Sequence, residues 1–261
     1  MHPEDARLLA AYDRLLEEAV GYVRAADIRP TTPGDVVVLG VAARVLQLAH
    51  AVHSLCASGH AGEAPALGRS ILNGTASLVA ICDRDREGRA FAFVHGGRLS
   101  HARIEGTARE LGLAGDERER FIRNLAEASG TGERQFIERG TYMLKLGSRR
   151  DTWHGLSDEQ LFSAMGMASW YELVYRTFSD ESHVNARAVT FEIREVLRRD
   201  VAFGSKFGPT WEVLLPSGRC VAEVIAQLNL AFDHRTRDRV LAISAPFEEA
   251  LQKYRRYDQV T

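Results

Sequence analysis

Charged and proton-transferring residues that could act on a phosphate group recur at helical spacing in the stretch YRTFSDESHVNARA, residues 175–188. They are Arg176, Asp180, His183 and Arg187. Because an α-helix turns by about 100° per residue, all four share one face of a helix, and two turns separate Arg176 from His183. The spacing predicts that the arginine and the histidine can reach the same phosphate group.

The helix that carries these residues is expected to have an apolar side as well. Glu172 extends the polar stripe, and its neighbours along the stripe alternate in sign at spacings of three and four residues, which favours ion pairs along the helix. The opposite side is formed by Met167, Trp170, Tyr171, Val174 and Phe178. A charged stripe opposite an apolar one is also typical of a solvated surface. Both interpretations, a phosphate site and a solvated face, stay open.

A second polar track lies in the apolar segment LGRSILNGTASL. Arg69 is the charged residue of this segment, and Asn73 and Ser77 follow it at four-residue spacing. Since an unpaired buried charge is costly, Arg69 is expected to have a partner. The side chain either extends to solvent or caps a neighbouring helix, or it lines a polar pocket between helices together with Asn73.

The pair Arg176 and His183 resembles the Arg-x4-6-His motif of the HEPN superfamily. These are helical proteins of toxin–antitoxin and anti-phage systems, and many are metal-independent ribonucleases. The resemblance implies RNA as a partner, no metal or other cofactor, and a homodimer whose motif helices face each other. His183 would then act as general acid and base, Arg176 would stabilise the phosphorane charge, and Asp180 would orient the histidine. Thr177 departs from the Asn, Asp or His often found after the arginine.

Arg149 and His154 in RRDTWH match the same spacing but are disfavoured. Residues five apart on a helix point about 140° from each other. In addition, Ser157 and Gln160 form a capping-box pattern that begins a helix near Asp158. His154 is therefore expected in the loop before that helix.

Two short stretches resemble the ARSxLE and LSxxxH sequences of an uncharacterised bacterial all-helical family, known only as a domain of unknown function. The matching residues are Arg69, Ser70, Leu72, Ser179 and His183. The order of elements agrees over residues 35–235, while Asn73 replaces the usual glutamate. The family brings no known activity. It leaves open an alternative function, a non-enzymatic binding or scaffold protein with a small polar pocket.

Other residue clusters do not predict a metal or nucleotide site. His50, His53 and Cys56 are three apart, so successive side chains rotate by about 60° away from a common point. The sequence has no HExxH or Walker motif. The three cysteines are far apart, which favours reduced thiols. We expect no bound metal.

Composition indicates an ordinary globular protein. The chain has 261 residues, of which 45% are hydrophobic and 26% charged, with a net charge of −2. A charge this small gives no global attraction for nucleic acid, so a phosphate site must depend on a local patch. The N-terminus is acidic and amphipathic, which argues against a signal peptide, and no segment is expected to reach the ~20 apolar residues of a membrane span. We expect a cytoplasmic protein without membrane contact.

Apolar residues recur at spacings of three and four, which predicts an all-α bundle of about eight to ten helices. Residues 1–261 are expected to form a single domain, with 84–150 as a peripheral helical subdomain. A long helix is predicted from Asp158 to about His183. The glycines and prolines after residue 200 predict a loop with at most a short strand near 211–215.

Overall fold

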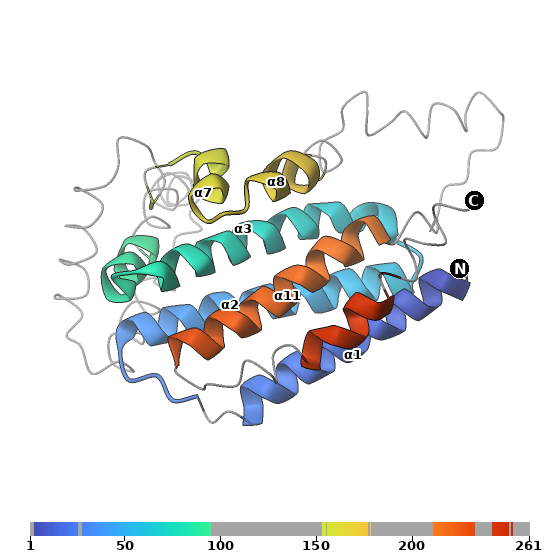
Figure 1. Ribbon diagram of the computed structural model, residues 1–261, viewed down its shortest axis with the longest axis horizontal. Helices are drawn as coiled ribbons and strands as arrows, with labels where there is room; N and C mark the ends of the chain where they lie inside the picture. The colour runs from blue at the N-terminus through green and yellow to red at the C-terminus, as the bar shows by residue number, and fades with distance from the viewer. Residues whose placement is uncertain are drawn as a thin grey trace, which may run out of the picture. The chain divides into compact units, whose positions relative to one another are not determined.

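The protein is described from a computed structural model, and every element in its described residues is helical (Figure 1). The described residues are 3–25, 28–94, 153–154, 156–176, 178, 211–232, 242–250 and 252. The elements with defined bounds are α1 (Pro3–Ala25), α2 (Pro33–Ala57), the 3-10 helix η1 (Ala61–Glu63), α3 (Ala64–Asp83), α7 (Asp158–Ala164), α8 (Ala168–Trp170), the π-helix η2 (Tyr171–Tyr175) and α11 (Trp211–Ala231). Residues 86–94 and 242–250 are also helical. The prediction of an all-α fold is confirmed.

The chain divides into two compact units. Unit 1 contains Met1–Ile28, Ala42–Thr75 and Met167–Thr261, and unit 2 contains Arg29–Val41 and Ala76–Gly166. The boundary crosses both α2 and α3. Of the subdomain predicted at 84–150, residues 95–150 lie outside the described part of the chain, so the predicted domain organisation stays a prediction.

In unit 1, α1 pairs with α11, and the two helices lie side by side in Figure 1. Tyr12 on α1 is fully buried; its hydroxyl hydrogen-bonds with Ser217 Oγ on α11 and donates to the Ala49 carbonyl at 3.3 Å. Burial raises the pKa of this phenol, so it stays neutral. Further along, the Tyr22 hydroxyl donates to Asn229 Oδ1 at 3.2 Å. Two buried hydrogen bonds therefore fix the register of α1 against α11.

The loop predicted around residues 211–215, with at most a short strand, is wrong, because these residues begin the helix α11. Pro216 is buried inside the helix and removes one backbone donor, a local cost of about 3 kcal/mol. Burial of Val213, Leu214 and the residues that follow outweighs this cost. Gly218 is required by its surroundings: a Cβ there would lie 2.3 Å from Cε1 of Phe247. Packing against the Phe247 ring explains why a glycine stands inside α11, although glycine by its own propensity favours a loop.

In unit 2, the start of α2 is capped as the sequence predicts. Thr32 Oγ1 accepts a hydrogen bond from the Asp35 backbone N–H at 3.2 Å. Asp35 Oδ2 in turn accepts from the backbone N–H groups of Thr31 and Thr32, at 2.9 and 3.1 Å, and from the Thr31 hydroxyl at 2.9 Å. Reciprocal bonds of this kind satisfy the free N–H groups of a helix end. The predicted N-cap at Thr32 is confirmed.

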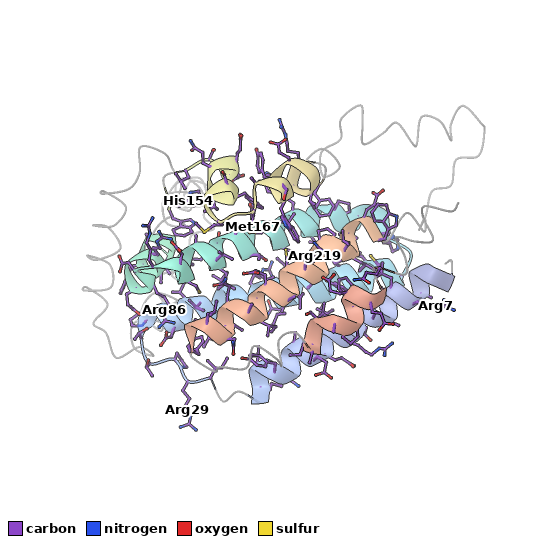
Figure 2. The ribbon with its side chains drawn as sticks, viewed as in Figure 1. Arg7, Arg29, Arg86, His154, Met167 and Arg219 are labelled. Carbon is purple, nitrogen blue, oxygen red and sulfur yellow. The ribbon has the colours of Figure 1, made fainter. Side chains whose placement is uncertain are left out.

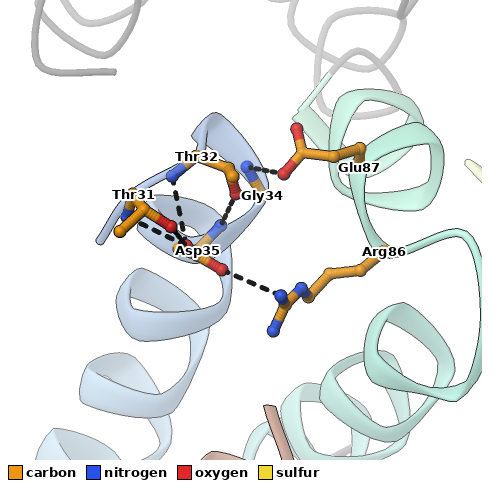
Figure 3. A network of polar contacts seen from close by, with 6 residues as sticks. All are labelled: Thr31, Thr32, Gly34, Asp35, Arg86 and Glu87. Carbon is orange, nitrogen blue, oxygen red and sulfur yellow. Dashed lines mark hydrogen bonds and ion pairs between the residues drawn. The ribbon is translucent and has the colours of Figure 1, made fainter. Parts of the chain in front are cut away.

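The same turn is tied to the helix at 86–94, as Figure 3 shows. Arg86 Nη2 lies 3.3 Å from Asp35 Oδ1, and the Gly34 N–H donates to Glu87 Oε1 at 3.0 Å. Asp35 is only 2% exposed. Burial by itself raises its pKa, but the hydrogen bonds from Thr31, the charge of Arg86 and the Thr32 N–H outweigh burial, so the pKa lies below the ordinary value.

Replacing Asp35 by asparagine is expected to lower the free energy of unfolding at pH 7 by about 1 kcal/mol, because the charge that attracts Arg86 is lost. A carboxyl with a lowered folded-state pKa stabilises the fold fully above its unfolded value, 3.8, and loses this effect as the pH falls through the folded value. The difference between variant and wild type should therefore shrink below pH ~4. Urea titrations from pH 7 to pH 2 measure it, with the exposed Glu17→Gln as control. A difference that is constant with pH would contradict this account.

Among the described helices, α2 alone is long and apolar enough to cross a membrane. This corrects the expectation that no segment reaches that length and composition. Half of the most apolar 18-residue segment of α2 is buried within the protein. Buried core helices satisfy the same criteria, so the observation is weak evidence for a membrane span.

The predicted long helix from Asp158 to His183 is interrupted. Its start is confirmed: the Gln160 N–H donates to Ser157 Oγ at 3.2 Å, and the Ser157 N–H donates to Gln160 Oε1 at 3.0 Å. However, α7 ends at Ala164, and Gly166 has a φ of 70°. A glycine in this left-handed conformation is a common helix terminator. The chain resumes as the short α8 and then as η2.

Candidate functional site

The two polar stretches identified in the sequence meet in unit 1, at the hydroxyl of Tyr175. Arg69 Nε on α3 donates to this oxygen at 3.2 Å, and Asn73 Nδ2, one turn later, donates to it at 3.3 Å. The guanidinium carbon of Arg69 also lies 5.1 Å from the centre of the Tyr175 ring, within cation–π distance. Tyr175 is buried, whereas Arg69 and Asn73 are half-buried. The predicted partner of Arg69 is therefore an aromatic hydroxyl.

Small and aromatic residues allow this close approach. A Cβ on Gly68 would lie 2.5 Å from Cε2 of Phe178, a side chain that is only 2% exposed. Tyr171 stacks on Tyr175, with ring centres 5.2 Å apart and planes 19° from parallel. The π-helix that carries both tyrosines is a rare conformation found frequently at functional sites. Gly68 and the aromatic residues thus hold Tyr175 against α3.

Among the described residues, no carboxylate neutralises the charge of Arg69. Within the part of the chain that the structure describes, no carboxylate lies within 4.0 Å of its guanidinium, and both of its contacts are to the neutral Tyr175. The Arg69 side chain is only half-buried, so part of it stays accessible. An accessible arginine with a fixed side chain and no counter-ion can bind an anion.

Arg176 follows Tyr175 directly and is exposed. Its Nη1 donates to Glu172 Oε2 at 2.8 Å, which confirms the first of the pairs predicted along the polar stripe. The side chains of Arg176 and Glu172 are 62% and 53% exposed, so this ion pair is solvated. Tyr175, which Arg69 contacts, and Arg176 are therefore adjacent residues of one segment.

Asp180, His183 and Arg187 lie outside the described residues, and their roles stay predictions. Tyr175 was missed in the sequence because neither the polar stripe nor the opposite apolar side included it. Two tyrosines four residues apart, next to an arginine, were a usable signal, since tyrosine offers both a ring face and a hydroxyl to a cation.

The histidines within the described part of the chain have ordinary structural surroundings. His154 lies in a turn before α7, as predicted; its Nδ1 accepts from the Leu156 N–H at 3.1 Å, and its ring packs edge-on against Trp153. Burial lowers the pKa of His154, which the charge of Asp158 only partly offsets. Arg149 lies outside the described residues.

On α2, His53 Nε2 lies 3.7 Å from Asp13 Oδ1, and His50 is exposed. Cys56 is buried, which raises the pKa of its thiol to about 12. The described residues contain no group of three His, Cys, Asp or Glu side chains placed to hold a metal ion. Arg219, labelled on α11 in Figure 2, pairs with Glu248 at 3.5 Å. The His53–Asp13 and Arg219–Glu248 pairs each connect two helices of unit 1.

Comparison with known proteins identifies a family but no activity. Residues 35–195, more than half of the chain, match the family of unknown function DUF5677. No curated protein and no solved structure is significantly similar to the chain. The matched segment contains both polar stretches, including Arg69 and Arg176. The resemblance to an uncharacterised family is confirmed at this level, and the chain belongs to the DUF5677 family of unknown function.

Proposed function

We propose that this protein is a HEPN-like ribonuclease that cleaves RNA without a metal ion. The observation that carries the proposal is the placement of Arg69: it has no counter-ion among the described residues, and it is fixed on the residue next to Arg176. Two arginines presented in this way can contact one RNA backbone, where Arg-to-phosphate contacts are strong and often bidentate.

In the proposed reaction, His183 takes the proton of the RNA 2′-hydroxyl. The 2′-oxygen then attacks phosphorus, the bond to the 5′-oxygen breaks, and the leaving oxygen regains a proton from the histidine. Arg176 stabilises the negative charge that builds up on the phosphoryl oxygens, and Asp180 orients the imidazole. Arg69, Asn73 and Arg187 bind the backbone. The products are a 2′,3′-cyclic phosphate and a 5′-hydroxyl.

The proposed ribonuclease is a homodimer in which the motif helices of the two copies face each other. It acts on RNA in the cytoplasm. A single motif supplies one histidine, and two copies would supply two histidines to one phosphate. Proton transfer to and from the reacting oxygens would then be shared between them.

A second candidate function is a non-enzymatic binding protein. It is favoured by the convergence of Arg69 and Asn73, both half-buried, on the single hydroxyl of Tyr175. Such a fixed set of donors suits a small anionic ligand or an acidic segment of a partner protein. The two functions differ in one respect, which is whether bound RNA is cut.

Incubation of the purified protein with RNA in the presence of EDTA tests the proposed function. Cleavage that leaves 2′,3′-cyclic phosphate ends supports a metal-independent ribonuclease. Cleavage that disappears with EDTA, or RNA binding without cleavage, would contradict it. The second outcome would favour the binding protein.

Replacing Arg69 by alanine is expected to weaken RNA binding about tenfold and to reduce the slope of log affinity against log salt by about 1, since one phosphate contact is lost. Lysine at this position should restore part of the affinity but not the fixed geometry. Arg44 is exposed on α2, so Arg44→Ala is the matched control and should leave the affinity unchanged. Equal losses in both variants would show a diffuse charge effect rather than a site.

A further inference from the structure

The two arginines of the candidate site differ in their counter-ions. Arg69 has no carboxylate within 4.0 Å among the described residues, whereas Arg176 Nη1 is bound to Glu172 Oε2 at 2.8 Å. Glu172 precedes Arg176 by four residues, the spacing and order that favour an ion pair along a helix. The three side chains together therefore carry a net charge of +1 when Glu172 is ionised.

We propose that Glu172 is an internal counter-ion that competes with the RNA phosphate for Arg176. This inference rests on the proposed function, because it assigns a regulating group to the same site. Arginine binds phosphate and carboxylate groups alike, and the hydrogen bond from Arg176 Nη1 to Glu172 Oε2 occupies a donor that a phosphate would use. Each RNA backbone that binds must displace Glu172 or accept its repulsion.

The geometry makes this competition readily reversible. More than half of each side chain is exposed, so the ion pair between Glu172 and Arg176 is solvated, screened by salt and weak. The carboxylate can rotate into water when a phosphate arrives, with Arg69 already fixed beside Tyr175. Arg69 is thus the permanent phosphate contact, and Arg176 is engaged only when a phosphate is held firmly enough to replace Glu172. Small anions that reach one arginine alone would bind weakly.

The substitution Glu172→Gln tests the proposal, because it removes the charge and keeps the size of the side chain. RNA affinity is expected to rise about three- to fivefold at low salt, near 50 mM, and the gain should vanish near 500 mM, where charges are screened. Fluorescence anisotropy with a labelled 2′-O-methyl RNA measures binding without cleavage. Glu18 is exposed on α1, so Glu18→Gln is the matched control and should leave the affinity unchanged.

A second variant shows whether the effect passes through Arg176. In an Arg176→Ala background, Glu172→Gln should change the RNA affinity by about twofold or less, since the arginine that Glu172 neutralises is absent. Affinity that is unchanged or weaker in Glu172→Gln alone would overturn the proposal, as would an equal gain in the Arg176→Ala background. A structural role of Glu172 would lower the thermal midpoint and would not produce a salt-dependent gain in affinity.

These outcomes separate the inference from the proposed function. If the wild type cleaves RNA and Glu172→Gln binds it no better, the inference fails and the ribonuclease stands. If the wild type binds RNA without cleaving it and Glu172→Gln binds RNA more tightly, the proposed ribonuclease activity is contradicted and the counter-ion role of Glu172 is supported. If neither protein binds RNA, both are overturned.

Discussion

Replacing His183 by alanine is expected to lower the rate of RNA cleavage by about 10²–10⁴-fold, the usual contribution of one general acid or base. Histidine side chains in general can both accept and release a proton at physiological pH, as this reaction requires at the 2′-hydroxyl and at the leaving oxygen. Arginine and asparagine side chains cannot replace it in this role at neutral pH. The loss should appear in the rate of the chemical step, with RNA affinity nearly unchanged.

Single-turnover cleavage in EDTA, with protein in excess over RNA, isolates this step. The free energy of unfolding of the variant should stay within about 1 kcal/mol of wild type, as expected for a residue that acts in chemistry rather than in packing. His50 is exposed on α2, so His50→Ala is the matched control and should cleave normally. Full activity in His183→Ala would remove this residue from the reaction, and an unfolded variant would assign it to the fold.

Replacing Gly218 by alanine is expected to destabilise the protein by about 2 kcal/mol, although alanine favours a helix more than glycine does. The added Cβ would lie 2.3 Å from Cε1 and 2.4 Å from Cζ of Phe247. That ring is 1% exposed and packs edge-on against Tyr12, at 5.9 Å between centres. A ring this deeply buried can move only by displacing its neighbours, so the overlap is expected to strain the contact between α11 and the helix at 242–250.

Chemical denaturation of a matched pair of glycine variants measures this effect. Gly21 is exposed on α1, and a Cβ there meets nothing within 4 Å. Gly21→Ala should therefore stabilise the protein by up to about 1 kcal/mol, the opposite sign from Gly218→Ala. The smaller side chain in Phe247→Leu should recover part of the loss in the double variant. A stabilising effect of Gly218→Ala would show that the contact with Phe247 is not tightly packed.

Local signals in the sequence predicted the starts of helices well. Thr32 with Asp35, and Ser157 with Gln160, form the capping bonds that their spacing indicated. A capping box involves only residues three apart, so it can be recognised without knowledge of the rest of the fold. The pairing of Glu172 with Arg176 was predicted for the same reason.

Features that depend on distant residues were predicted poorly. Pro216 and Gly218 favour a loop locally, yet burial of α11 and the ring of Phe247 impose a helix. The end of α7 was missed because a single glycine inside a helical pattern is often tolerated, and only the left-handed φ of Gly166 distinguishes a terminator. Tyr175 was missed because its partners come from α3, about 100 residues earlier in the sequence.

The pairing of α1 with α11 has a consequence for how the chain is made. About 185 residues separate the end of α1 at Ala25 from the start of α11 at Trp211. At ~5–20 residues per second, a ribosome needs about 10–40 s to cover this interval. During that time Tyr12 and Tyr22 on α1 lack their hydrogen-bond partners Ser217 and Asn229 on α11. The pairing of the first helix with α11 is therefore a late event in the synthesis of the chain.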